Sequence, residues 1–112
     1  MATFNQQNQK VQYQYNADTI NFGHAQSQED FFSELNKLEA ELEKAIQAKA
    51  ITGEDAIDAE THVKKALLQA QEQTPNKISL IDHLTSAKEL VTSVEGLATV
   101  FATAITTIAA LF

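Results

Sequence analysis

An unbroken apolar repeat occupies the last third of the chain. Its members are spaced alternately three and four residues apart over about four heptads, the spacing of a coiled-coil-type seam. They are Leu84, Ala87, Val91, Val94, Ala98, Phe101, Ile105, Ile108 and Phe112. A second stripe recurs every seven residues at Leu90, Leu97, Ala104 and Leu111. Together the two stripes predict a helix with an apolar face too wide for one partner helix to cover.

Two amphipathic helices are expected before this repeat, over residues 28–50 and 53–73, with Ser27 and Thr52 as their N-caps. The apolar side of the first contains Phe31, Leu35, Leu38, Leu42 and Ala45. The second is rich in alanine and presents Ala56, Ala59, Val63, Ala66, Leu67 and Ala70. The short connection predicts a helical hairpin in which Leu38 and Leu42 are buried against Val63 and Leu67.

The third helical segment is expected over residues 77–112. As one helix it would be about 52 Å long, against about 33 Å for each of the first two helices. An antiparallel hairpin cannot cover that length. Either the segment breaks near Gly96 to give a four-helix bundle, or its end projects from a three-helix bundle. The expected fold is therefore mainly α, with a helical domain at residues 28–112.

Residues 1–27 form a separate leader that is rich in Gln and Asn and carries little charge. Val11, Tyr13 and Tyr15 alternate with polar residues, and Ile20 and Phe22 continue the alternation after a turn-prone stretch. Such a pattern predicts a short β-strand or hairpin. A lone hairpin is marginal in water, so its strands need a partner edge. The composition also fits a disordered polar leader, or amyloid-like stacking of identical strands.

The charge balance and the residue types argue against several functions. Eight Lys, no Arg and fifteen acidic residues give a net charge of −7, which leaves no basic stripe for nucleic acid. The absence of Cys excludes disulfides and thiolate metal sites. His24, His62 and His83 form no pair four residues apart, and the carboxylates lie among Lys on predicted solvent faces. We therefore expect no metal, no cofactor and no enzymatic activity.

Residues 96–112 contain no charged side chain and, as a run of 17 residues, reach the lower limit for a membrane span. Threonine hydroxyls in this run can bond to carbonyls of their own helix, which makes them tolerable in lipid. The candidate pore-lining residues are Thr99, Thr103, Thr106 and Thr107. Three interpretations stay open: a central helix of a soluble bundle, a helix that enters a membrane after assembly, and an oligomer interface in water.

The leader pattern at residues 11–23, followed by Glu-, Lys- and Ala-rich helices and an apolar tail, resembles a group of small bacterial modules common in cyanobacteria. These are effector-associated and amyloid-signalling modules, in which an Asn/Gln-rich β leader precedes a helical domain. The resemblance implies a part in bacterial immune or cell-death signalling, with a larger signalling protein as a partner. It carries no functional residue over to this chain.

The expected function is a non-enzymatic, self-assembling signalling module in the cytoplasm, whose partners are copies of itself. The alternative is a pore-forming effector that associates with a membrane on assembly and inserts residues 96–112. The residues expected to hold the copies together are Val11, Tyr13, Tyr15, Ile20, Phe22, Val94, Ala98, Phe101, Ile105, Ile108 and Phe112.

Overall fold

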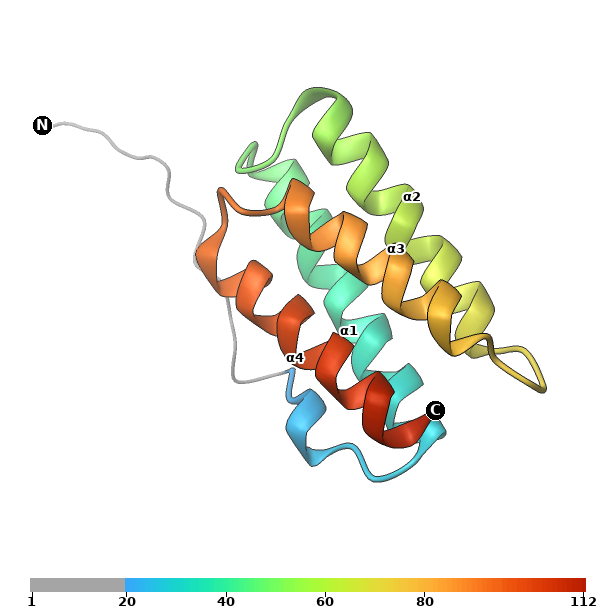
Figure 1. Cartoon of the computed structure of the whole chain (residues 1–112). Helices are drawn as coiled ribbons and strands as arrows, with labels where there is room; N and C mark the ends of the chain where they lie inside the picture. Colours follow the sequence, from blue (N-terminus) through green and yellow to red (C-terminus); the bar gives the residue numbers. More distant parts are fainter. Residues whose placement is uncertain (1–19) are drawn as a thin grey trace, which may run out of the picture.

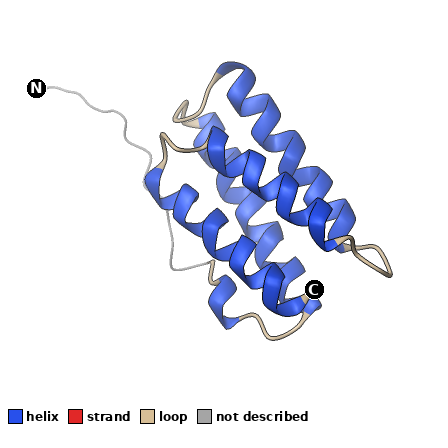
Figure 2. Cartoon of the chain, viewed as in Figure 1, coloured by secondary structure: helices blue, strands red, loops and turns tan. Residues whose placement is uncertain are grey.

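The computed structural model describes residues 20–112 as four α-helices arranged in sequence order around a bundle (Figure 1). The elements are a short 3-10 helix η2 (Phe22–His24), α1 (Gln28–Gln47), α2 (Gly53–Ala70), α3 (Lys77–Leu90) and α4 (Glu95–Leu111). Each helix packs against the next, and α4 closes the bundle against α1. Consecutive helices run in opposite directions, and the described residues contain only helices and loops (Figure 2). The expected mainly α fold is confirmed, and of the two arrangements left open by the sequence the chain adopts the four-helix one.

Local hydrogen bonds define both ends of α1. Ser27 is the N-cap, as predicted, and its side chain accepts a hydrogen bond of 3.1 Å from the Asp30 amide. The helix ends earlier than residue 50 because Lys49 adopts a left-handed backbone with φ 63°. The amides of Lys49 and Ala50 then bond to the carbonyls of Ile46 and Ala45, at 3.0 and 2.9 Å. This pair of bonds is a Schellman motif, which satisfies the last carbonyls and stops the helix.

The long apolar segment divides into α3 and α4 at residues 91–94, just before the position proposed from Gly96. Val91 and Val94 both lie in the core at this turn. The Ser93 hydroxyl donates to the Ala50 carbonyl at 3.2 Å, which ties the turn to the α1–α2 connection. The break lets the apolar stripe fold back over a hairpin that is too short to cover one continuous helix.

The core is formed by apolar positions that the helical spacing predicts. Leu35, Leu38 and Leu42 of α1 are fully buried, as is Val63 of α2. The predicted burial of Leu38 and Leu42 in the α1–α2 hairpin is therefore confirmed. Because Ala56, Ala59 and Ala66 are also buried, α2 can approach its neighbours closely.

Replacing Leu38 with alanine is expected to lower the free energy of unfolding by about 2–5 kcal/mol, because a fully buried side chain is removed and a cavity remains. Urea unfolding followed by circular dichroism measures the loss. Leu68→Ala is the matched control, since Leu68 is 64% exposed and its loss should stay within about 0.5 kcal/mol. Equal losses for the two variants would contradict the burial of Leu38.

Candidate functional site

Helix α4 has two opposite faces of different character. Its inner side is fully buried and consists of Leu97, Phe101, Ala104 and Ile108. Its other side carries small, uncharged, exposed residues, which we call the α4 outer face: Thr99, Thr103, Thr106, Ala109 and Ala110. The spacing of these residues follows from the helical period, which places the threonines opposite the buried stripe.

The threonines on α4 use their hydroxyl groups inside the chain. Thr103 and Thr106 donate to the carbonyls of Thr99 and Ala102, each at 3.2 Å. The Thr107 hydroxyl lies 2.8 Å from the Thr103 carbonyl and 3.4 Å from the Phe22 carbonyl. The predicted back-bonding is therefore present. Because the Thr103 and Thr106 hydroxyls donate to carbonyls of their own helix, the outer face presents mainly methyl groups and small side chains to its surroundings.

Most of the apolar seam is covered within a single chain. Val94, Phe101 and Ile108 are buried in the core, whereas Ala98, Ile105 and Phe112 are half-buried at its edge. Within one chain, α1, α3 and η2 all pack against α4, so this wide apolar face has three partner elements. Of the six residues, the three half-buried ones keep the most exposed surface.

Ile20 and Phe22 also belong to the core and do not lie on an exposed strand. Phe22 begins the 3-10 helix η2, and its exposure is only 1%. Its ring lies 5.1 Å from that of Phe31, which lies 5.2 Å from that of Phe112. The predicted strand is therefore wrong for residues 20–23, because these apolar side chains fill the bundle instead of alternating across a sheet. The positions of Val11, Tyr13 and Tyr15 fall outside the described residues.

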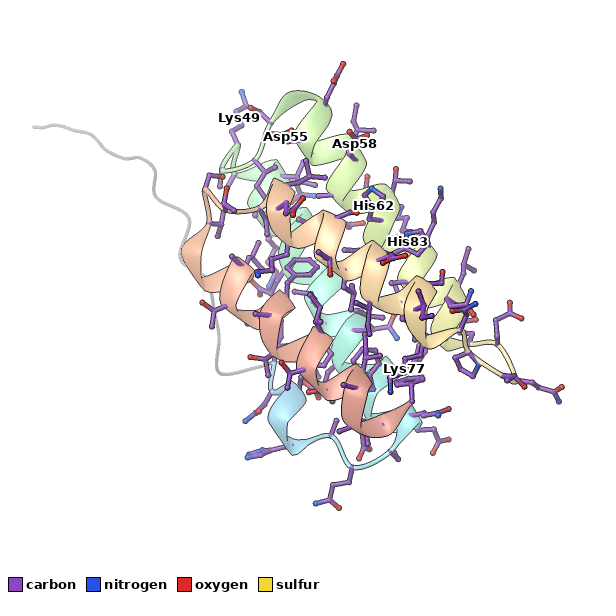
Figure 3. All side chains as sticks on the ribbon, in the orientation of Figure 1. Lys49, Asp55, Asp58, His62, Lys77 and His83 are labelled. Atoms are coloured by element: carbon purple, nitrogen blue, oxygen red, sulfur yellow. The ribbon has the colours of Figure 1, made fainter. Side chains whose placement is uncertain are left out.

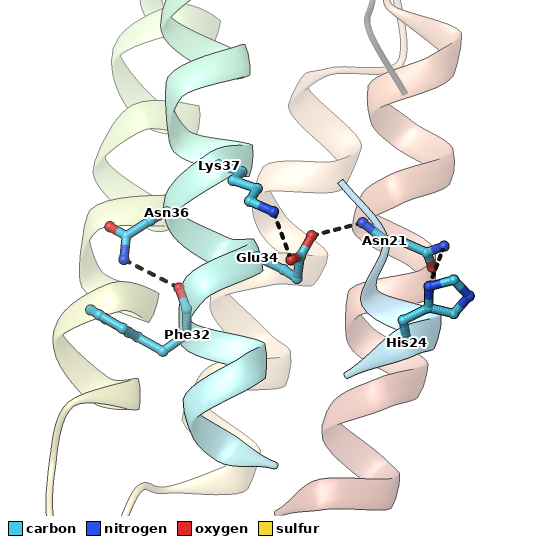
Figure 4. Close-up of polar contacts among 6 residues, drawn as sticks. All are labelled: Asn21, His24, Phe32, Glu34, Asn36 and Lys37. Atoms are coloured by element: carbon cyan, nitrogen blue, oxygen red, sulfur yellow. Dashed lines mark hydrogen bonds and ion pairs between the residues drawn. The ribbon is translucent and has the colours of Figure 1, made fainter. Parts of the chain in front are cut away.

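Polar contacts fix the start of the described chain, at Asn21 and His24, against α1. Figure 4 shows Glu34 of α1 accepting from the Asn21 amide at 2.8 Å and from Lys37 at 3.0 Å. The Asn21 side-chain amide lies 3.2 Å from Nδ1 of His24. Because η2 also packs against α4, with its Phe22 carbonyl 3.4 Å from the Thr107 hydroxyl, the described chain begins next to α4.

The C-terminal end of α4 is bound by side chains from two other helices. Lys77 of α3 donates to the Ala109 carbonyl at 3.3 Å, and Gln28 of α1 donates to the Leu111 carbonyl at 3.2 Å. A cation at this end of a helix is favourable, because the helix dipole is negative there.

Among the helices of residues 20–112, none combines the length and the apolarity needed to span a membrane.

Sequence reasoning missed a contact between two histidines, His62 of α2 and His83 of α3. Their Nδ1 atoms are 3.3 Å apart, and the two half-buried rings face each other across the helix pair (Figure 3). The pairing of α2 with α3 could have revealed this contact, because the two residues lie at about the same distance in sequence before and after the loop at residues 71–76.

Within the described chain, no three His, Cys, Asp or Glu side chains gather as a potential metal site.

Comparison with known protein families, with curated protein sequences and with solved structures finds no match to this chain.

Proposed function

We propose that the chain is a non-enzymatic module that assembles with copies of itself through the α4 outer face. The observation that carries the proposal is a surface of small, uncharged residues on an otherwise acidic bundle. The module would work in the cytoplasm as the assembling part of a larger signalling system. This role agrees with the resemblance to bacterial effector-associated and amyloid-signalling modules.

The distribution of charge favours this face as the contact surface. The chain has a net charge of −7, so two copies repel each other in most relative orientations. Residues 96–112 carry no charge, whereas acidic residues are spread over α1, α2 and α3. An α4-to-α4 contact therefore keeps the acidic surfaces of the two copies apart. Small side chains also let helix axes approach to the short end of the usual 8–10 Å range.

The leader would strengthen the same contact. The described chain begins at Ile20, beside η2, and η2 packs on α4. The sequence pattern of Val11, Tyr13 and Tyr15 suits strand pairing between copies. Two weak contacts made by the same chain reinforce each other, because the first raises the effective concentration for the second.

The pore-forming alternative has less support from the geometry. Insertion of α4 would remove Leu97, Phe101 and Ile108 from the core, where all three are fully buried. It would also break the bonds that Lys77 and Gln28 make to the end of the helix. Self-assembly through the outer face requires neither change, because the buried side of α4 stays in place.

Adding two glutamates to the α4 outer face is expected to weaken assembly by more than tenfold. The variant carries Thr103→Glu and Thr106→Glu, both at exposed positions, so the core is unchanged. Like charges brought together in an interface cost several kcal/mol, and tenfold corresponds to about 1.4 kcal/mol. Sedimentation velocity over a range of protein concentrations measures the effect on the dissociation constant.

A matched variant separates the effect of position from that of total charge. Thr61→Glu with Thr74→Glu adds the same charge at exposed positions on α2 and in the loop at residues 71–76, and it should leave assembly within a few fold of the wild type. Equal weakening by the two variants would contradict a specific role for the α4 outer face. A wild-type chain that stays monomeric at every concentration would overturn the proposal itself.

A further inference from the structure

The contact between His62 and His83, called here the histidine pair, requires a particular distribution of protons. The Nδ1 atoms are 3.3 Å apart, and the ring centroids are 5.5 Å apart with a tilt of 39° between the planes. A hydrogen bond between two imidazole nitrogens needs one nitrogen as donor and the other as acceptor. The bond is therefore possible only while at least one of the two Nδ1 atoms carries no proton.

We propose that the histidine pair is a proton-sensitive contact between α2 and α3, which is present when at most one imidazole is charged and is lost when both are charged. In the doubly protonated state both Nδ1 atoms are donors, so no hydrogen bond can form between them. The two positively charged rings would also repel each other across the short distance that now separates their Nδ1 atoms. This inference is independent of the proposed self-assembly.

The surroundings of the pair reinforce its sensitivity to protons. Partial burial lowers the pKa of His83, and the nearby charges of His62 and Lys65 on α2 lower it further. Asp82, on the same helix as His83, acts in the opposite direction and is the weakest of these influences. Helix α4 also packs against α3, but residues 96–112 have no ionisable side chain. Asp82 is therefore the one of these groups that favours the charged form of His83, and its effect is the smallest.

The direction of the pH effect follows from the lowered pKa of His83. An unfolded histidine has a pKa of about 6.5, so the unfolded chain takes up the proton at a higher pH than the folded chain. The stabilisation is fully present above that value. It is lost as the pH falls from about 6.5 through the lower pKa of the folded state.

The test follows the ring protons of all three histidines by NMR during a pH titration of the full chain in the presence of EDTA. In the wild type, His83 is expected to titrate below the ordinary histidine range. His62→Gln should raise the pKa of His83, because a positive neighbour is removed. His24→Gln should leave the titration of His83 unchanged, since His24 lies on η2 and outside the pair. His83→Gln provides the reciprocal measurement on His62, should the first variant fold poorly.

Unfolding in urea provides the second measurement. The double variant carries both His62→Gln and His83→Gln. Between pH 8 and pH 5, the urea concentration at the midpoint of unfolding should fall further for the wild type than for this variant. Titration of His83 at the same pH in the wild type and in His62→Gln would overturn the proposal. A coupling that appears only with added Zn²⁺ and disappears in EDTA would also overturn it, and would assign the contact to a metal ion instead.

Discussion

Replacing Phe31 with alanine is expected to lower the free energy of unfolding by about 3–5 kcal/mol. Phe31 is fully buried, and its ring contacts Phe22 at 5.1 Å and Phe112 at 5.2 Å between centroids. Such aromatic pairs contribute about 0.5–1.5 kcal/mol beyond the area they bury. The substitution therefore weakens the packing of α1, of η2 and of the end of α4 together. A domain with a total stability of about 5–15 kcal/mol would lose a large part of it.

Phe32→Ala is the matched control for this prediction, because it removes the same side chain from the next position of the same helix. Phe32 is only partly buried and packs against the edge of the core. Its replacement should cost clearly less than that of Phe31 in urea unfolding followed by circular dichroism. Losses of equal size would mean that the aromatic cluster of Phe22, Phe31 and Phe112 does not anchor the bundle.

Removing residues 1–23 is expected to destabilise the bundle much more than removing residues 1–19. The longer deletion takes away Ile20 and Phe22, whose exposures are 5% and 1%. The loss of Phe22 alone should cost about 3–5 kcal/mol, the range for a large aromatic side chain removed from a core. The longer deletion also removes the Asn21 amide that bonds to Glu34.

The melting temperatures of the two deletion variants, measured by circular dichroism, test this expectation. Equal melting temperatures would show that Ile20 and Phe22 contribute nothing to the core. The shorter deletion also isolates the role of the leader in assembly, because it leaves the described domain complete. A lower oligomeric mass in light scattering, with an unchanged melting temperature, would assign the leader to contacts between copies.

The helices and most of the core could be predicted from the spacing of apolar residues. That spacing reports which side of a helix is buried, and it correctly placed Leu35, Leu38 and Val63 inside. The end of α1 was harder to predict, because it depends on a left-handed backbone at Lys49 where glycine is the usual residue. The sequence leaves a break near Gly96 and an unbroken helix both open, whereas the break between α3 and α4 lies at residues 91–94.

The alternation at residues 19–23 predicts a strand, which is wrong for residues 20–23, because period-two spacing does not reveal what covers an apolar side chain. Ile20 and Phe22 are both buried in the observed fold, but by α-helices. The histidine pair was missed for a similar reason. Spacing along a helix reports only neighbours on that helix. His62 and His83 lie on different helices and meet only because the hairpin aligns α2 with α3.

The contact between η2 and α4 has a consequence for the order of folding. It joins residues far apart in the sequence, since the Thr107 hydroxyl and the Phe22 carbonyl are separated by 85 positions. Contacts between consecutive helices close much shorter loops, which cost less entropy and form earlier. The contact of Phe22 with Phe31 closes a loop of only nine residues, whereas its contact with Thr107 can form only once α4 is in place. During synthesis, we therefore expect η2 to leave the ribosome before α1 but to complete its contacts only after α4 has joined the bundle.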